Sequence, residues 1–194
     1  MTSIVPSEGA VKLEPRPDDG IAFLNLLRPA GPWLFTAISS KSKSIETREF
    51  GPGDAVLKWI ATKNRAGWNV YYHVNPIKAR LDEKGNPIKA NLDDVIQAEF
   101  IFADIDRALV GKGEEEPAET CKAGALKRLA SYNPTFIVDS GNGIQALWRL
   151  AEPSTDFDDV EARNRTLVSR LGGDKAVHDV PRILRLPGTV NWLA

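Results

Sequence analysis

The chain has 194 residues, 42% of them hydrophobic, and its 25 basic and 26 acidic side chains leave a formal net charge of −1. Such a chain can form one compact domain or two smaller units that share a cleft. Its near-neutral total excludes a polyanion-binding surface over the whole molecule. The single cysteine and the lack of an apolar run of roughly 20 residues exclude a disulfide framework, a cysteine zinc site and a membrane-spanning helix. We therefore expect a soluble cytoplasmic protein without a membrane partner.

Helices and strands alternate in the first half of the chain. Residues 1–18 are rich in proline and are expected to be loosely ordered, and one folded domain is expected over residues 19–194. The elements predicted here are a helix through Phe23 and Leu27, a strand from Trp33 to Ser39, a helix from Asp54 to about Gly67 and a strand around Tyr71. The residues between Ser39 and Asp54 are predicted to form a polar loop.

The second half continues the same alternation. Its predicted elements are a strand from Phe100 to Ala103, a helix from Ala118 to Ser131, two strands around a turn from Thr135 to Leu150, and a helix from Asp156 to Leu171. Helices that alternate with strands favour an α/β fold, and no internal repeat is evident.

Two aspartates follow the predicted strand at Phe100. Asp104 and Asp106 are two residues apart, so on a strand they share one face, with backbones roughly 7 Å apart at about 3.3 Å of rise per residue. Mg²⁺ and Mn²⁺ prefer carboxylate ligands, and two such ions about 3.5–4 Å apart commonly assist in-line displacement at phosphorus. An Asp-x-Asp pair also ends ordinary strands in solvent, so the pattern alone leaves both interpretations open.

A glycine-rich turn joins the two later strands. In Ser140-Gly141-Asn142-Gly143 the glycines allow backbone N–H groups to approach an anion, which favours a small nest for phosphate oxygens. Ser140 and Gln145 add side-chain donors. Asn-Gly is also the commonest hairpin signal, and a plain hairpin needs no ligand.

An acid and two arginines follow the last predicted helix. Asp174 comes after two glycines, which allow it to reach a site formed by other strands. Arg182 and Arg185 carry planar cations suited to phosphate oxygens. A spacing of three places them on one side of a helix or on opposite sides of a strand, so both need not reach the same ligand. Both arginines can instead pair with Asp174 and Asp179, and Asp179 is the alternative candidate metal ligand.

In this order the three elements resemble the catalytic core of an archaeo-eukaryotic-type primase, specifically the RepB-like primase and primase-polymerase branch of plasmids, phages and integrated elements. The matching parts are Asp104 and Asp106 for the Asp-x-Asp motif, residues 140–145 for the Ser-Gly-x-Gly motif, Asp174 for the acid of the third motif, and residues 185–191 for the run Arg-Leu-Pro-Gly-Thr-x-Asn. The resemblance covers about residues 33–192.

The resemblance implies an α/β (α+β) fold of mixed or antiparallel sheets flanked by helices, with an RRM-like unit. It implies that residues 19–194 are a catalytic domain excised from a longer protein, with a helicase or helical accessory region as a partner. The implied activity is that of a metal-dependent nucleotidyltransferase, which synthesises or extends primers on a single-stranded DNA template from NTPs or dNTPs during replication of a mobile element.

The resemblance also implies roles for individual residues. Two Mg²⁺ or Mn²⁺ ions would be held by Asp104, Asp106 and Asp174, and the nucleotide by Ser140, Asn142, Gly143, Gln145, Arg182 and Arg185. Many superfamily members carry histidine where this chain has Gln145. Because glutamine donates a hydrogen bond without a positive charge, phosphate affinity should depend more on Arg185 and the backbone of the turn.

Single-stranded DNA needs a local basic surface on a chain of this net charge. Lys41, Lys43 and Arg48, within the predicted polar loop, are the candidate nucleic-acid-binding residues. Two other functions use the same residues. A noncatalytic single-strand or origin-binding module would use the basic loop alone, and a metal-dependent nuclease would use the acids without a triphosphate pocket.

Overall fold

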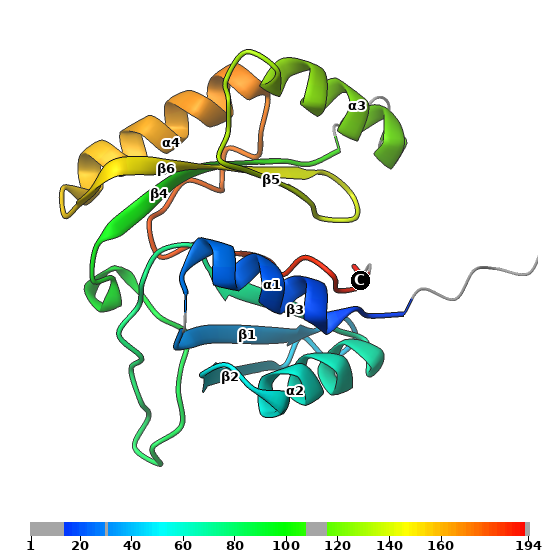
Figure 1. Ribbon diagram of the computed structural model, residues 1–194, viewed down its shortest axis with the longest axis vertical. Helices are drawn as coiled ribbons and strands as arrows, with labels where there is room; N and C mark the ends of the chain where they lie inside the picture. The colour runs from blue at the N-terminus through cyan, green and yellow to red at the C-terminus, as the bar shows by residue number, and fades with distance from the viewer. Residues whose placement is uncertain (1–13, 30, 108–115, 193–194) are drawn as a thin grey trace, which may run out of the picture.

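The structure is a computed structural model and describes residues 14–29, 31–107 and 116–192. Two antiparallel sheets form the framework, one above the other in Figure 1. Residues 1–13 of the segment predicted to be loosely ordered lie outside the described residues. No helix in the described ranges is long and apolar enough to cross a membrane.

The first sheet has the strand order β2-β1-β3-β7, and each neighbouring pair is antiparallel. Its strands are β1 (Trp33–Ser39), β2 (Ile45–Phe50), β3 (Trp68–His73) and β7 (Ile183–Arg185). Two helices, α1 (Pro17–Leu27) and α2 (Asp54–Arg65), pack against this sheet through its core. Pro17 occupies the start of α1, where its missing N–H costs no helical hydrogen bond.

The second sheet has the order β4-β6-β5 and is also antiparallel. Its strands are β4 (Ala98–Ile105), β5 (Phe136–Asp139) and β6 (Ile144–Ser154), and the 3₁₀ turn η1 (Leu92–Asp94) precedes them. Helices α3 (Ala118–Leu129) and α4 (Phe157–Leu171) cover the side of this sheet that faces away from the first sheet (Figure 1). Asp156 caps α4, and Gly172 ends it in a left-handed conformation.

Alternation along β4 fixes which side chains face the first sheet. Phe100 and Phe102 are fully buried in the core that joins the two sheets. Ala103 and Ile105 point the other way and pack beneath α3 and α4. Because side chains alternate with a period of two, Asp104 shares the face of Phe100 and Phe102. It therefore faces the first sheet from the end of β4.

The residues after α4 connect the two sheets. We call residues 172–192 the crossing segment, because they lead from α4 past the second sheet to β7 in the first (Figure 1). Buried carboxamide side chains hold its backbone along most of its length. The pairs are Asn164 with His178, Asn75 with Val180, Asn64 with Val190, and Asn69 with Trp192. Neutral hydrogen bonds thus fix a segment that has little strand pairing of its own.

The predicted α/β organisation with antiparallel sheets and flanking helices is confirmed. One element was predicted wrongly: residues 45–50, predicted to be polar loop, form β2. Only Thr47 of this edge strand is buried, so β2 lacks the apolar alternation that marks a strand in a sequence. Helix α1 begins at Pro17, two residues before the predicted start of the folded domain.

Candidate active site

A pocket of about 360 Å³ opens between the two sheets, where β4 and β6 approach β3 and β7. Six of the residues predicted for the site line it: Asp104, Asp106, Ser140, Asn142, Gln145 and Arg185. Six further residues in its lining had no predicted role: Tyr71, Arg107, Ile183, Leu184, Asn191 and Trp192. The structure thus brings the first two motifs and part of the third together around one cavity.

Negative charge gathers at the end of β4. Asp104 is half-buried, and its Oδ1 atom is buried without a hydrogen-bond partner among the described residues. Asp106 follows the strand and is exposed. Burial raises the pKa of Asp104 to about 7, and the charges of Asp106 and Asp174 add to this effect. A bound cation would relieve both the repulsion and the unpaired oxygen.

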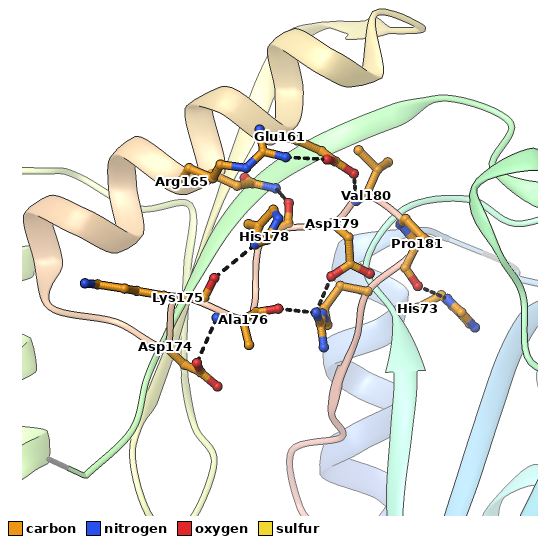
Figure 2. A network of polar contacts seen from close by, with 12 residues as sticks. His73, Glu161, Arg165, Asp174, Lys175, Ala176, His178, Asp179, Val180 and Pro181 are labelled. Carbon is orange, nitrogen blue, oxygen red and sulfur yellow. Dashed lines mark hydrogen bonds and ion pairs between the residues drawn. The ribbon is translucent and has the colours of Figure 1, made fainter. Parts of the chain in front are cut away.

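The backbone of Asp174 lies directly against β4, where its N–H donates to the carbonyl of Asp104 at 2.8 Å. Gly173 allows this approach, because a Cβ there would lie 2.6 Å from the same carbonyl oxygen. The Asp174 carboxylate itself is exposed and accepts a hydrogen bond from the N–H of Ala176 at 2.9 Å (Figure 2). It is close enough to raise the pKa of Asp104 but does not line the pocket.

Arg182 and Asp179 bind each other rather than the pocket. Within the crossing segment, the Arg182 guanidinium contacts the Asp179 carboxylate and the carbonyl of Ala176. Neither Arg182 nor Asp179 is in the pocket lining. Of the two aspartates proposed as the third metal ligand, only Asp174 is without an arginine partner in the described chain.

The residues present fit a hard divalent cation at one pair of carboxylates. Asp104 and Asp106 supply oxygen ligands of the kind that Mg²⁺ and Mn²⁺ prefer, and the buried Oδ1 of Asp104 is unsatisfied. Among the described residues, no three acids, histidines or cysteines are close enough to hold a metal together. Asp174 would have to turn inward to complete a triad, so the preformed part of the site is the pair.

Arg185 faces the carboxylate pair from β7. One of its nitrogens, Nη2, donates to the hydroxyl of Tyr71 at 3.3 Å, and its guanidinium carbon lies 5.0 Å from the centre of the Tyr71 ring. The second terminal nitrogen, Nη1, is buried without a hydrogen-bond partner in the described ranges. Tyr71 therefore orients a cation that keeps donor capacity for an anionic ligand.

Gln145 holds the backbone of Arg185. It pairs with Asp104 in the register of β6 and β4, so both side chains face the first sheet. With the amide oriented to satisfy both contacts, its Oε1 accepts from the Arg185 N–H at 3.2 Å and its Nε2 donates to the Arg185 carbonyl at 3.3 Å. Because β7 is an edge strand, this buried side chain takes the place of a neighbouring strand. Gln145 was predicted to bind phosphate directly; the contacts with Arg185 use its Oε1 atom and one of its two Nε2 hydrogens, so a direct contact would use the remaining hydrogen.

The turn between β5 and β6 is a closed hairpin rather than an open phosphate nest. The Gly141 N–H donates to the Asp139 carboxylate at 2.7 Å, and the Gly143 N–H donates to Oγ of Ser140 at 3.1 Å. Gly143 is required by packing, because a Cβ there would lie 2.1 Å from the carbonyl oxygen of Ile105. Gly143 was predicted to bind the nucleotide, but its N–H is already bonded to Ser140. Asn142, by contrast, lines the pocket.

The basic residues predicted to bind nucleic acid are in two places. Lys41 and Lys43 lie in the exposed loop between β1 and β2. Arg48 is not in this loop but on β2, where its Nε lies 3.3 Å from the Glu46 carboxylate. The three side chains therefore do not form one patch: Lys41 and Lys43 line one surface hollow and Arg48 another.

The sequence contained a sign that two of the lining residues without a predicted role, Tyr71 and Asn191, belong to the pocket. Tyr71 and Tyr72 are adjacent on β3, so they point to opposite faces; Tyr72 is buried in the core and Tyr71 reaches the pocket. Asn191 ends the matched run after Arg185, and its Nδ2 donates to the carbonyl of Ser140 at 3.1 Å. Trp192 follows the last motif, and only its position in the fold shows that it borders the pocket.

Comparisons with known proteins agree with this geometry. Residues 119–192 match a family model described as the RepB DNA-primase N-terminal domain. A replication protein of Clostridium perfringens is 27% identical over 104 residues, which make up 52% of this chain and 25% of that protein. The matched segment therefore spans about a quarter of this curated relative.

Solved primase structures share the fold. The crystal structure of primase RepB′ has a TM-score of 0.61 at 16% identity, covering 91% of this chain and 51% of that one. The catalytic domain of RepB′ in complex with initiator DNA has a TM-score of 0.60 at 16% identity, covering 90% and 77%. The corresponding domain of the cyanophage S-2L primase-polymerase reaches 0.62 at 17% identity, covering 91% and 84%. The chain therefore has the fold of the archaeo-eukaryotic-type primases, and its resemblance to their RepB-like branch is confirmed.

Proposed function

We propose that this chain is a metal-dependent nucleotidyltransferase that synthesises or extends short primers on single-stranded DNA in the replication of a mobile element. One observation carries the proposal: a carboxylate pair, Asp104 and Asp106, faces Arg185 across a pocket of about 360 Å³. The buried Oδ1 of Asp104 and the buried Nη1 of Arg185 both lack partners in the described chain. A cation would satisfy the Asp104 oxygen, and a triphosphate would satisfy the Arg185 nitrogen.

Each residue of the pocket has a chemical task in this proposal. Asp104 and Asp106 hold Mg²⁺ or Mn²⁺, and Asp174 joins them from the crossing segment. When bound, the metal supplies activation of a 3′-hydroxyl and neutralisation of the triphosphate and leaving pyrophosphate. Arg185 binds the triphosphate through the donor that Tyr71 leaves unused. Because the nucleophile belongs to the substrate, no nucleophilic protein side chain is required.

Ser140 and Asn142 border the same cavity from the β5–β6 turn. The Asn142 side chain contacts the nucleotide, whereas Ser140 and Gly143 chiefly hold the turn in shape through their mutual hydrogen bonds. Gln145 acts on the nucleotide through the backbone of Arg185. Arg182 is assigned to the crossing segment rather than to the nucleotide, because it is paired with Asp179.

The relatives support the proposal at a coarser level. They include a primase, a primase-polymerase and a replication protein, and one solved relative is in complex with initiator DNA. We extend this chemistry to the present chain as template-directed synthesis with NTPs or dNTPs. We include a helicase or helical accessory domain as a further partner in this role.

Nucleotide binding tests the proposal. We expect Arg185→Ala to weaken the binding of a nucleoside triphosphate, measured by titration calorimetry with Mn²⁺, by 10-fold or more, since a charge-assisted contact is worth about 1.5–3 kcal/mol. Its affinity for single-stranded DNA should change little. Arg182→Ala is the matched control and should keep nucleotide affinity within about 2-fold, since Arg182 lies outside the pocket.

Two results would favour another function. Equal losses of nucleotide and DNA affinity in Arg185→Ala would indicate a general nucleic-acid surface and a noncatalytic binding module. Metal-dependent degradation of DNA, with no nucleotide binding by the unaltered protein, would indicate a nuclease.

A further inference from the structure

A basic hollow lies next to the candidate active site. It has a volume of about 650 Å³, and Lys41, Lys43 and Arg65 contribute its charged side chains. Among the residues that the structure describes, no acidic side chain lines it. Lys41 and Lys43 make no ion pair with any described residue, and Arg65 makes an exposed one, at 3.4 Å, with Glu14. The hollow therefore has positive charge that the protein neutralises only in part.

The loop that carries the two lysines has a defined conformation. Lys43 has a φ of 60°, in the left-handed region that residues other than glycine seldom adopt. Its N–H donates to the Ser39 carbonyl at 3.1 Å, and the Ser39 hydroxyl accepts from the N–H of Ser42 at 3.1 Å. The lysines are thus presented from a turn whose own hydrogen bonds are satisfied.

Trp192 connects this hollow to the candidate active site. Its half-buried side chain lines both the basic hollow and the pocket that contains Asp104 and Arg185. Its indole N–H donates to the carbonyl of Asn64 at 2.7 Å, and its backbone is paired with the side chain of Asn69. An aromatic side chain is therefore held at the border between a cationic surface and a nucleotide-sized cavity.

Another border of the active-site pocket has different electrostatics. A second hollow of about 650 Å³ meets the pocket at Asn142 and Asn191. Three acids line it, Glu14, Glu119 and Asp139. Of its two cations, Lys122 pairs with Glu119 and Asp139 at 3.2 and 2.9 Å, and Arg16 pairs with Asp19 at 3.1 Å. A polyanion gains little from cations that are already paired, so the side with Lys41 and Lys43 is the favourable route to the pocket.

We propose that a single-stranded nucleic-acid segment lies in the basic hollow, with backbone phosphates on Lys41, Lys43 and Arg65 and a base against Trp192, before it enters the active-site pocket. The arrangement combines a cationic track with an aromatic platform, the two features by which proteins bind single strands without reading sequence. This inference rests on the proposed function, since it concerns the strand on which that chemistry acts. Arg48 is left out of the track because it lies over a different hollow.

Binding of a labelled oligothymidylate of about 20 nucleotides, without metal or nucleotide, tests the lysines. We expect Lys41→Ala/Lys43→Ala to lower affinity on the order of 10-fold near 0.1 M salt. Loss of two phosphate contacts should also reduce the slope of log K against log salt by about 1.4. Lys84→Ala/Lys89→Ala removes the same charge from a distant exposed turn and should leave both quantities unchanged.

The aromatic contact needs a separate variant. We expect Trp192→Ala to lower affinity by roughly 10-fold with an unchanged salt slope, because a base stacked on an aromatic ring adds affinity without releasing ions. Trp192→Phe keeps an aromatic face but loses the hydrogen bond to Asn64, and it should bind close to the unaltered protein. If Trp192→Phe and Trp192→Ala lose the same affinity, Trp192 has only a structural role and the platform is excluded.

The outcomes separate this inference from the proposed function. If the unaltered protein binds the oligonucleotide but forms no product with nucleotides, the proposed function fails, and the lysine and tryptophan variants still decide where the strand lies. If the lysine variant binds like Lys84→Ala/Lys89→Ala, the track is wrong even if the protein extends primers. The track is also wrong if the lysine variant loses affinity for a free nucleoside triphosphate as strongly as for the oligonucleotide, because the hollow would then bind the nucleotide instead.

Discussion

Asp104 combines a functional requirement with a cost in stability. Its carboxylate is partly buried beside Asp106, one oxygen lacks a partner within the described chain, and its pKa is raised to about 7. An ionised group under these conditions destabilises the folded state until a cation joins it. The same arrangement is what a metal site requires.

We expect Asp104→Asn to increase the free energy of unfolding by on the order of 2 kcal/mol at pH 8.5 in a chelator, because it removes a poorly solvated charge. Mn²⁺ should raise the melting temperature of the unaltered protein and have little effect on the variant. Thermal unfolding with and without metal measures both. The charge-matched control, Asp158→Asn on the exposed surface of α4, should not stabilise the protein; if it does so equally, the effect is not specific to the site.

Gln145 is expected to act on nucleotide binding through Arg185. Gln145→Ala leaves the N–H and carbonyl of Arg185 without their partners, so we predict a loss of about 1–3 kcal/mol in the free energy of unfolding. The KM for nucleotide should rise more than kcat falls, because the misplaced group binds phosphate. Gln97→Ala removes a glutamine whose Nε2 bonds Glu99 near the surface and should change neither value. A drop in kcat at constant KM would contradict this role.

The sequence predicted which residues line the pocket better than it predicted which groups those residues contact. Asp104, Asp106 and Arg185 could be chosen because carboxylates bind hard cations and guanidinium groups bind phosphate, and all three line one pocket. The partners of Gln145 and Arg182 could not be predicted. Both depend on how the crossing segment packs between the sheets, and this is determined by residues far from either motif.

The β5–β6 turn shows how an element can resemble a phosphate loop without an open nest. Its N–H groups at Gly141 and Gly143 are bonded within the hairpin, and Gly143 allows the turn to pack on the end of β4. Gly143 is therefore needed because the backbone of the turn lies against the backbone of β4. This close packing places Asn142 at the edge of the pocket.

We predict that Gly143→Ala destabilises the protein by several kcal/mol or prevents folding, because a Cβ would lie 2.1 Å from the carbonyl oxygen of Ile105. Denaturant unfolding measures the effect. Gly51→Ala is the control, since a Cβ there meets nothing within 4 Å and should change stability by less than about 1 kcal/mol. Equal stability of the two variants would show that the turn does not pack closely on β4.

Regular elements were predictable where one face is buried. Helices α2, α3 and α4 have apolar side chains at helical spacing, and each was placed to within a few residues. Strand β2 was missed because its exposed, charged residues show no alternation. It forms because the backbone of β1 offers a partner edge along six residue pairs, a property of the assembled sheet rather than of residues 45–50.

The whole molecule places its candidate chemistry at the junction of two sheets. The second sheet carries the acids, and the first sheet carries Arg185 on a strand that belongs to the crossing segment. The crossing segment is held mainly by carboxamides and by His73, whose Nδ1 contacts the Pro181 carbonyl at 3.0 Å. This junction could not be predicted from sequence, because no local pattern shows which sheet the last strand joins.

His73 makes overall stability dependent on pH. Burial lowers the pKa of His73 to about 4 from an ordinary value of 6.5, and its Nε2 has no partner in the described chain. Because the unfolded chain takes up the proton first, the contribution of His73 is fully present above pH 6.5 and decreases as the pH falls toward 4. The full loss is about 3 kcal/mol, at roughly 1.4 kcal/mol per unit of pKa difference.

Comparison with His73→Asn isolates this effect from the carboxylates. We expect the difference in unfolding free energy between the unaltered protein and the variant to shift in favour of the variant between pH 7 and pH 4.5, as measured by denaturant titration. Parallel pH profiles for the two proteins would show that His73 is not buried in its neutral form.

The central claim is that the pocket between the sheets catalyses nucleotide transfer. The most direct measurement is incubation with single-stranded DNA, labelled nucleotides and Mn²⁺ or Mg²⁺, with and without an annealed primer, beside Asp104→Ala/Asp106→Ala. We predict labelled products that disappear in the double variant, and products without a primer would show initiation as well as extension. Absence of product under both conditions, from a protein that still binds DNA without metal, would contradict the claim and favour a noncatalytic binding module.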